Sequence, residues 1–449
     1  MSEHVDVVVV GAGFAGLTAA RELTRAGLSA RVLEARDRVG GRVYTTTLEG
    51  GPWVDLGGQW AGPTQDHLLA LIAEHGLPTF GTWTRGDNLL LVNGRTRRYR
   101  GTIPRLDLPS LLNVGYAQWR LERMAKKVPL DAPWSAPRAA EWDRATFASW
   151  LDANLRTRTA RKLLEAGLET VFAASAHEMS LLHVLFYIHS GKDLDMLLGS
   201  DGGAQATRVD GGMQQVAEKL AAGLDVRLSS PVRRIDHDGT GVTVHHDGGS
   251  VRGERAIVAV PPKLVAQIDF RPALAGKRAE LVRRMPMGAV IKCTAIYERP
   301  FWRDDGLSGM SVADEGPIHV VFDNSPPGAE VGVLMGFCEA AHARELGKLS
   351  IEDRRDRAIA CFVRTHGPRA KDVLRYADHV WEHDPWSGGC YGAFMPPGVW
   401  TSLGPAIREP IGRIHWAGTE TATRWSGYID GAISSGKRAA AEVHARARA

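Results

Sequence analysis

Cysteine, charge of one sign and long apolar runs are all scarce in this chain of 449 residues. Its four cysteines, at positions 293, 338, 361 and 390, lie far apart without a CxxC pair, which excludes a cysteine zinc site and a disulfide framework. Lysine and arginine number 55 against 51 aspartates and glutamates, a net charge of +4, and no block of like charge occurs. Because nucleic-acid binding normally requires a concentrated basic stripe, we expect no nucleic-acid partner.

Targeting, membrane and hydrolase signals are missing as well. No stretch of about 18 apolar residues occurs, and the first expected strand, Val5–Val10, begins too early for a signal peptide. No GxSxG motif occurs, and His177-Glu178 does not continue to HExxH because residue 181 is leucine. We therefore expect a cytoplasmic protein with no membrane anchor, no metal site and no hydrolase chemistry.

What the sequence does contain begins with a β–α–β pattern. Val7–Val10 is a β-branched run typical of a strand buried on both faces, and the glycine-rich stretch Gly11–Gly16 follows it. A helical stretch then ends at Gly27, and a second strand, Ala30–Leu33, leads into Glu34. This is the setting in which GxGxxG binds a dinucleotide, and the motif alone suits NAD and FAD equally.

Each part of this motif has a physical role in holding a dinucleotide. Gly11 permits the tight turn, Gly13 lets the backbone approach the pyrophosphate, and Gly16 allows the helix and the strand to pack closely. The N-terminus of the helix offers free N–H groups to phosphate. The carboxylate of Glu34 can accept hydrogen bonds from the ribose hydroxyls.

Two further glycine pairs favour FAD. Arg36–Arg42 contains a glycine pair between arginines, and it resembles the second phosphate-contacting segment of FAD-binding oxidases of the glutathione reductase superfamily. Asp55–Trp60 contains another pair and resembles the segment beside the isoalloxazine ring in the same group. Either pair alone would suit an ordinary turn, but their order after the first motif indicates FAD.

The rest of the chain predicts an α/β protein in which two domains are interleaved. Residues 81–210 are glycine-poor and expected to be helical, with a buried helix at Leu181–Ile188. Turn signals then separate short strands up to Val260, and Ala289–Tyr297 is expected to form an alternating strand. We predict a discontinuous FAD-binding Rossmann-like domain of the glutathione reductase type at 1–80, 211–288 and 389–449. A mixed α+β substrate-binding domain is expected at 81–210 and 289–388.

The most specific short stretches lie near the C-terminus. Trp386–Tyr391 places a cysteine between a glycine pair and a tyrosine, although an isolated cysteine is usually a small buried hydrophobe. Gly418–Gly431 predicts a strand end, a polar turn and a helix start. Backbone N–H groups there would face an electron-rich edge such as the pyrimidine ring of a flavin.

From the first glycine motif to the GTETATRWSGY stretch, the chain resembles flavin-containing monoamine oxidases of a soluble, bacterial type. The resemblance implies FAD joined through a thioether from Cys390 to the 8α-methyl carbon. It also implies a catalytic set in which Tyr391 and Tyr428 flank the substrate and Lys292 holds a water at flavin N5. The membrane-anchoring C-terminal helix of the mitochondrial members is missing, and Trp60 replaces a different aromatic of those members.

The motifs and the resemblance together define the expected site. The expected cofactor-binding residues are Gly11, Gly13, Ala15, Gly16, Glu34, Ala35, Arg36, Gly41, Arg42, Gly57, Gly58, Gln59, Trp60, Val232, Trp381, Cys390, Gly418, Thr419, Tyr428 and Ile429. The expected substrate pocket contains Trp60, Leu198, Gln205, Val320 and Phe337.

Lys292 can also be argued from its sequence surroundings. It lies within the apolar run Val290–Ile296, where desolvation disfavours an ammonium group, and lysines of this kind are often functional. The alternative is a lysine at the edge of a strand whose head group reaches solvent.

The resemblance implies oxidative deamination of primary amines, arylalkyl or alkyl monoamines, to aldehyde, ammonia and hydrogen peroxide. The small-molecule partners would be the amine and oxygen, and the protein could form a homodimer. Diamine or polyamine oxidation needs a carboxylate for the distal ammonium, and amino-acid oxidation needs an arginine for the substrate carboxylate. A non-catalytic binding protein of the same fold is a remoter alternative.

Overall fold

The first sheet forms around the N-terminal strand, whose residues Val7–Val10 are buried. The computed structural model describes residues 3–101, 106–328 and 330–447. β1 (Glu3–Val10) pairs in parallel with β2 (Ala30–Leu33) and with β13 (Gly249–Val258). The eight strands have the order β10-β2-β1-β13-β12-β11-β14, with β20 beside β13. The other strands are β10 (Asp225–Arg227), β11 (Val232–His237), β12 (Val242–His246), β14 (Asp269–Arg271) and β20 (Ile414–Trp416).

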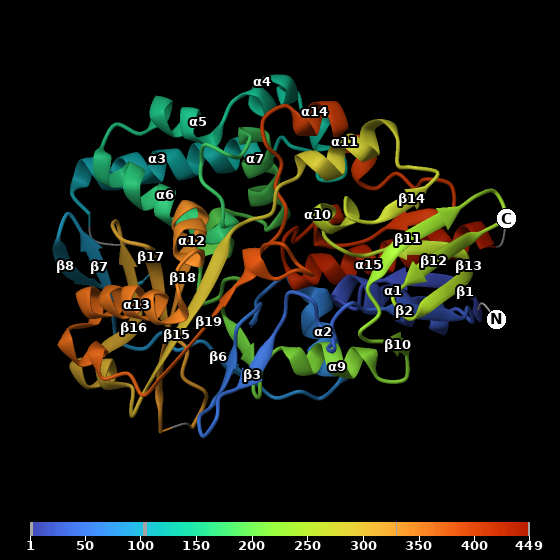
Figure 1. Cartoon of the computed structure of the whole chain (residues 1–449). Coiled ribbons are helices and arrows are strands. Elements are labelled where there is room, and N and C mark those ends of the chain that lie inside the picture. Colours follow the sequence, from blue (N-terminus) through green and yellow to red (C-terminus); the bar gives the residue numbers. More distant parts are fainter. Residues whose placement is uncertain (1–2, 102–105, 329, 448–449) are drawn as a thin grey trace.

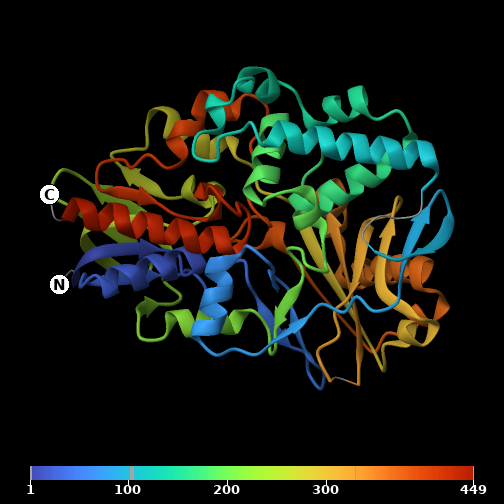
Figure 2. The same cartoon turned by 180° about the vertical axis from the view of Figure 1, so that it is seen from behind.

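Helices from both ends of the chain cover one face of this sheet. α1 (Phe14–Arg25) follows β1 directly, and α15 (Ile429–Ala447) lies along it, as Figure 2 shows. Their apolar side chains share one core with α2 (Asp66–Glu74) and α9 (Gln214–Ala221). The two termini therefore lie at the same end of the molecule (Figure 1).

The second sheet lies at the other end of the molecule and has seven strands (Figure 1). Their order is β19-β15-β18-β17-β16-β7-β8, and all neighbours are antiparallel except β16 and β7. The strands are β7 (Asp87–Val92), β8 (Arg95–Tyr99), β15 (Val290–Tyr297), β16 (Leu307–Ala313), β17 (Ile318–Asp323), β18 (Gly332–Glu339) and β19 (Arg375–Val380). α12 (Ala340–Gly347) and α13 (Ile351–His366) pack on one face.

A helical layer lies over the second sheet and reaches toward the first (Figure 1). Its helices are α3 (Leu108–Ala125), α4 (Ala139–Arg144), α5 (Phe147–Asn154), α6 (Arg158–Phe172), α7 (Leu181–Ser190) and α8 (Leu194–Leu198). α7 is buried at all but one position, as its continuous apolar sequence predicts. Further α-helices are α10 (Pro262–Val265), α11 (Gly276–Arg284) and α14 (Val399–Leu403).

Short strands connect the two large sheets. β3 (Thr45–Thr47) pairs with β4 (Trp53–Asp55), while β5 (Trp60–Ala61) and β6 (Thr79–Gly81) flank β9 (Thr207–Val209). These pairings bring the Asp55–Trp60 segment against residues 207–209, although about 150 residues of chain separate them.

Two predictions about secondary structure were wrong. The segment 87–99 is not helical, because Asp87–Val92 and Arg95–Tyr99 form a hairpin about the Asn93-Gly94 turn. The strand at 290–297 does not alternate between buried and exposed, because all eight of its residues are buried. One face of that strand packs against α13 and the other packs toward Trp381 and Cys390, so both faces are covered, and Lys292 and Thr294 on the second face are buried as well.

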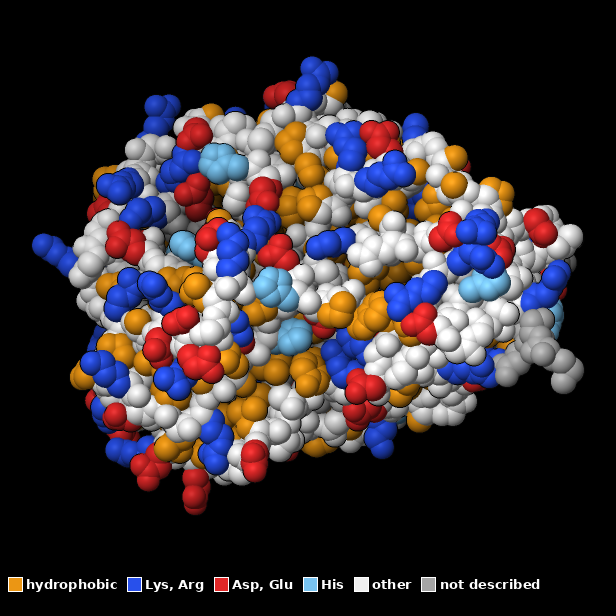
Figure 3. Space-filling view, in the orientation of Figure 1, with side chains coloured by type: hydrophobic (Ala, Val, Ile, Leu, Met, Phe, Trp, Pro, Cys, Tyr) orange, Lys and Arg blue, Asp and Glu red, His pale blue; other side chains and the backbone are white. Residues whose placement is uncertain are grey.

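The surface shown in Figure 3 mixes lysine and arginine with aspartate and glutamate, and neither sign forms a continuous area. Among the described residues, no helix is long and apolar enough to cross a membrane.

Candidate cofactor and substrate site

A first cavity opens beside the turn between β1 and α1. Its lining combines the N-terminal glycine motif with the end of β2 and with the two C-terminal stretches. Of the expected cofactor-binding residues, it contains Gly11, Gly13, Ala15, Glu34, Ala35, Arg36, Gly41, Arg42, Gly58, Val232, Cys390, Gly418, Thr419, Tyr428 and Ile429.

The glycines of the first motif have the geometry that a dinucleotide requires. Gly11 has a φ of 99°, and a Cβ on Gly16 would lie 1.9 Å from the carbonyl oxygen of Gly11. A Cβ on Gly13 would meet no protein atom within 4 Å, so the part of the first cavity that Gly13 lines has room for a ligand close to the backbone. α1 has no acidic residue in its first turn and no side-chain cap, which leaves its N-terminal N–H groups for an anion such as pyrophosphate. These residues fit FAD.

Glu34 lies where a carboxylate can meet a ribose. Its Oε2 accepts a hydrogen bond from the backbone N–H of Ala12 at 2.7 Å, and its Oε1 accepts one from Arg36 at 2.9 Å. These bonds hold a buried carboxylate at the edge of the cavity lining.

Two arginines anchor the C-terminal stretches to the cavity. Arg36 Nη2 donates to Asp384 Oδ1 at 2.6 Å and to Ser387 at 2.8 Å. Burial alone would raise the pKa of Asp384, but hydrogen bonding to His379 and the charge of Arg36 lower it to about 2. Arg36 therefore forms an ion pair with the ionised Asp384 carboxylate.

The second arginine holds the tyrosine segment. Arg42 Nη1 lies 2.6 Å from Glu420 Oε1 and 2.8 Å from the carbonyl oxygen of Tyr391. Glu420 is buried and Arg42 is half-buried, so loss of Arg42 would leave a buried carboxylate without its charge partner.

Cys390 lies in the lining of the first cavity, and its side chain is buried. Burial raises the pKa of its thiol to about 12, against the opposing charge of Arg42. The protein alone therefore keeps this sulfur protonated, and does not hold it as a free thiolate.

A second cavity, of about 310 Å³, meets the first at a pair of tyrosines. Tyr391 and Tyr428 belong to both linings, together with Gly58, Gly427 and Ile429. The ring of Tyr391 lies edge-on to Phe337 with centroids 5.9 Å apart, and Tyr428 lies 6.0 Å from Tyr187. Rings fixed in this way can orient a small molecule that enters from the second cavity.

All five expected substrate-pocket residues line the second cavity: Trp60, Leu198, Gln205, Val320 and Phe337. The lining is mostly apolar, and its single carboxylate among the described residues is Asp195. Asp195 is exposed and accepts a hydrogen bond from Gln118 at 2.8 Å, so it lies toward solvent. Gln205 donates to the carbonyl of Leu197 at 3.0 Å, and its buried Oε1 has no hydrogen-bond partner.

The flavin-containing amine oxidoreductase family matches residues 14–444 of the chain. The chain belongs to this family of flavin-dependent amine oxidases. A Mycobacterium tuberculosis protein, provisionally named flavin-containing monoamine oxidase AofH, is 46% identical over 443 residues, 98% of this chain and 97% of that protein. The flavin-containing amine oxidase A of Sus scrofa is 37% identical over 98% of this chain and 85% of its own length.

Solved structures of amine oxidases confirm the predicted fold class. A putrescine oxidase bound to putrescine superposes with a TM-score of 0.96 at 33% identity, over 99% of this chain and 100% of that chain. Cyclohexylamine oxidase from Brevibacterium oxydans IH-35A superposes with a TM-score of 0.95 at 32% identity, with the same coverage.

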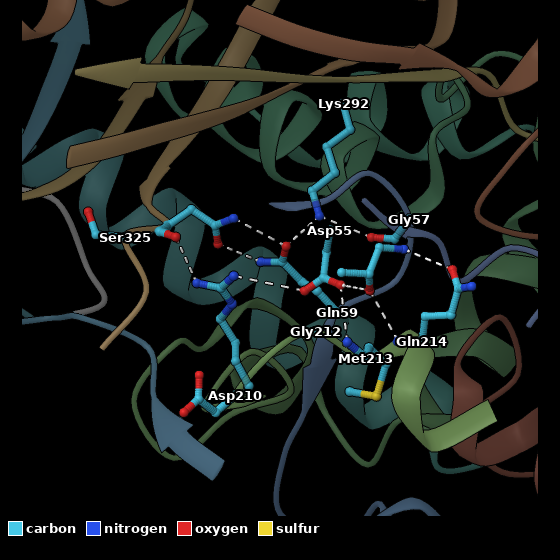
Figure 4. Close-up of polar contacts among 12 residues, drawn as sticks. Asp55, Gly57, Gln59, Asp210, Gly212, Met213, Gln214, Lys292 and Ser325 are labelled. Carbon is cyan, nitrogen blue, oxygen red and sulfur yellow. Dashed lines mark hydrogen bonds and ion pairs between the residues drawn. The ribbon is translucent and has the colours of Figure 1, made fainter. Parts of the chain in front are cut away.

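Within this amine oxidase, Lys292 lies behind the wall that the two cavities share. Its side chain is 2% exposed, and its Nζ donates to the carbonyl of Gly57 at 3.0 Å and to the side-chain oxygen of Gln59, as Figure 4 shows. The ammonium lies 5.8 Å from the ring centroid of Trp60 and 5.9 Å from that of Phe337. Burial lowers its pKa to about 7. The head group therefore faces the interior, and the solvent-reaching alternative does not apply.

Several predicted residues lie outside the first lining. Gly57, Gln59 and Trp60 line the second cavity instead. Trp381 is buried beside Cys390 in one apolar cluster and donates from Nε1 to Leu56 at 2.9 Å, without lining either cavity. Gly16 likewise lines neither cavity and acts through helix packing.

Sequence reasoning missed one wall of the second cavity. Tyr187 of α7 belongs to it, as do five residues of α6: Leu163, Leu164, Gly167, Thr170 and Val171. Their sequence shows only an amphipathic helix, because nothing local indicates which partner the apolar face meets. No group of three potential metal ligands occurs in the part of the chain that the structure describes.

Proposed function

We propose that this amine oxidase deaminates primary monoamines, with FAD in the first cavity and the amine in the second. The supporting observation is that Tyr391 and Tyr428 line both cavities, so an amine between their rings would lie at the cofactor's boundary. Bound FAD would take a hydride equivalent from the amine α-carbon and pass two electrons to oxygen, which yields hydrogen peroxide.

The tyrosine rings and the second cavity set the proposed substrate class. The electron-rich ring faces would attract an amine and orient its α-carbon. Beyond them the lining is apolar, with Val320, Phe322 and Phe337 on one side. It suits the body of an arylalkyl or alkyl amine, since apolar area removed from water contributes about 25 cal/mol per Å².

A peroxide-coupled screen of benzylamine, phenethylamine, tyramine, putrescine and amino acids tests this function. We expect kcat/KM for the monoamines to exceed that for putrescine at least tenfold. Asp195→Asn is the matched control, because it removes the carboxylate in the cavity lining and should leave monoamine oxidation unchanged. Putrescine as the best substrate, with kcat/KM lost in Asp195→Asn, would establish the diamine alternative instead.

We also propose that FAD is linked covalently to Cys390. The sulfur lies in the cavity lining between the Gly388-Gly389 pair and Tyr391. A putrescine oxidase structure with an alanine-to-cysteine change, 34% identical to this chain, is described as a redesign of cofactor binding, which supports a cofactor role for cysteines in such sites. Acid precipitation should leave flavin absorbance with the protein, and Cys390→Ala should release it. Flavin wholly in the supernatant of the unmodified protein would exclude the link.

We infer that the domains divide as the sequence predicts, with cofactor binding at 1–80, 211–288 and 389–449. Support comes from the first cavity, whose lining residues come from these three segments except for Trp386 and Ser387, which lie just before the third. Limited proteolysis with and without FAD tests the division, since FAD should protect these segments more than 81–210.

A further inference from the structure

Two charged side chains lie behind Lys292 in the protein interior, and the proposed chemistry does not use them. Asp55 is 1% exposed and Arg208 is 2% exposed. Asp55 ends β4 and Arg208 lies in β9, so both belong to the short strands between the large sheets. Burying charge is costly unless it is paired, which makes this arrangement unusual for a purely structural core.

The two charges are close but only partly paired. Arg208 Nη2 lies 3.8 Å from Asp55 Oδ2, beyond hydrogen-bond distance, and this carboxylate oxygen has no hydrogen-bond partner. The other oxygen, Oδ1, accepts from the backbone N–H of Met213 at 3.1 Å and from the Thr45 hydroxyl. The guanidinium lies 5.1 Å from the ring centroids of both Trp53 and Phe80, which hold it in place.

A chain of hydrogen bonds connects Arg208 to Lys292 (Figure 4). Arg208 Nη1 donates to the backbone carbonyl of Asn324 at 2.9 Å. The Asn324 side-chain oxygen accepts from Gln59 Nε2 at 2.8 Å, and the oxygen of the same Gln59 amide accepts from Lys292. Gln59 is 1% exposed and Asn324 is 3% exposed, so water does not screen the charges at either end.

We propose that Asp55 and Arg208 are positioning residues that together set the fraction of Lys292 carrying a proton at the wall between the two cavities. This inference rests on the proposed function, in which FAD occupies the first cavity. Asp55 attracts the Lys292 proton, and Arg208 opposes it by repulsion and by engaging the same carboxylate.

The signs follow from the charges around Lys292. Burial is the largest influence on the Lys292 pKa and lowers it, while Asp55 raises it and Arg208 lowers it further. Two other titratable groups face Lys292: Cys390, and His379, its cross-strand neighbour in β19. His379 Nε2 lies 3.5 Å from Asp384. Cys390 carries no charge either as a thiol, whose pKa burial raises, or as a thioether to the flavin, so neither group substitutes for Asp55.

Three variants separate the two opposing effects. Arg208→Met keeps an unbranched side chain between Trp53 and Phe80 but removes the positive charge, so the Lys292 titration should move to higher pH. Asp55→Asn keeps the shape but removes the negative charge, so the titration should move to lower pH. Arg208→Lys restores the charge and should return the titration to near its parent position.

The measurement is the rate at which photoreduced flavoprotein, prepared without any amine, is reoxidised by oxygen between pH 5.5 and 10. Oxygen takes two electrons and two protons and becomes hydrogen peroxide, and a nearby cation favours this transfer, so the rate should fall as Lys292 loses its proton. We expect midpoint shifts of about one pH unit in opposite directions, which is about a tenfold change in the protonation ratio. A pH titration of the oxidised flavin spectrum should show the same midpoints without turnover, and Lys292→Met should abolish both.

The outcomes divide cleanly. Shifts in the same direction, or unmoved midpoints in Arg208→Met and Asp55→Asn, would overturn the inference. If Arg208→Met fails to bind flavin, the test depends on Asp55→Asn alone. An unshifted pH midpoint of reoxidation in Asp55→Asn would then refute the inference. Reduction of the flavin by amines is measured separately. If the two variants shift the midpoint in opposite directions but no amine reduces the flavin, the proposed function is refuted and the inference about Lys292 is retained.

Discussion

Replacing Lys292 by methionine should change the stability of the protein in a way that depends on pH. Burial lowers the pKa of Lys292 from 10.5 to about 7. At 1.36 kcal/mol per unit, the folded state bears about 5 kcal/mol of cost for the ammonium below pH 7. Between pH 7 and 10.5 the unfolded chain holds more protons than the folded chain, so the stability of the parent rises with pH through this window.

The variant lacks this titration. From pH 7 to pH 9.5 the parent should therefore gain about 3 kcal/mol of unfolding free energy relative to Lys292→Met. Methionine also leaves the oxygens of Gly57 and Gln59 without their donor, at about 1–3 kcal/mol each. That second cost is the same at both pH values, so it cancels from the comparison between them.

Urea unfolding of both proteins at pH 7 and pH 9.5, at equal flavin content, measures this difference. Lys348→Met is the matched control, since the Lys348 side chain is 65% exposed and its substitution should give no comparable pH dependence. Equal changes in stability for the parent and Lys292→Met would show that the ammonium is not desolvated, and would refute the reasoning.

Further predictions concern the cofactor and the two tyrosine rings proposed to flank the amine. Tyr428→Phe should keep most of the amine-dependent reduction rate, whereas Tyr428→Leu should lose much of it with flavin still bound. Equal rates for Tyr428→Leu and the parent would show that the Tyr428 ring does not orient the amine. In stopped-flow traces, Lys292→Met should slow reoxidation by oxygen more than reduction by amine, and unchanged half-reactions would make the lysine structural. Gly13→Ala should fold with an unchanged melting temperature without flavin yet bind FAD weakly, whereas Gly16→Ala should destabilise the fold itself, because its Cβ would overlap the Gly11 carbonyl. Asp384→Asn should cost about 2 kcal/mol at neutral pH, with the difference fading as the pH falls from about 4 toward about 2, as acid unfolding curves can check.

Local pattern was sufficient wherever neighbours in the chain are neighbours in space. The strand, turn and helix of Val7–Arg25 follow from β-branched residues and glycines that act within one motif. The hairpin at 87–99 was missed although its Asn93-Gly94 turn was present, because the helical reading of the longer segment was extended over it.

Contacts between segments that are far apart in the chain could not be predicted from the local sequence pattern. The five α6 residues and Tyr187 that line the second cavity belong to helices whose sequence gives only an apolar face. The proximity of Asp55 and Arg208, 153 positions apart, depends on the pairing of β5 with β9, and nothing in either strand indicates its partner. The cavity residues near the tyrosines were predicted from the resemblance to flavin-containing monoamine oxidases, and the local sequence alone does not indicate them.

The interleaving of the two sheets also sets the order in which the protein can be completed on the ribosome. The first sheet takes strands from residues 3–33, 225–271 and 414–416, and the tyrosine pair and Gly418 follow the second sheet in the chain. The nascent chain thus lacks one wall of the cofactor cavity until almost all of it has been synthesised. A chain that stops before residue 414 would keep the N-terminal glycine motif but would lack Gly418, Thr419 and Tyr428 from the cavity lining.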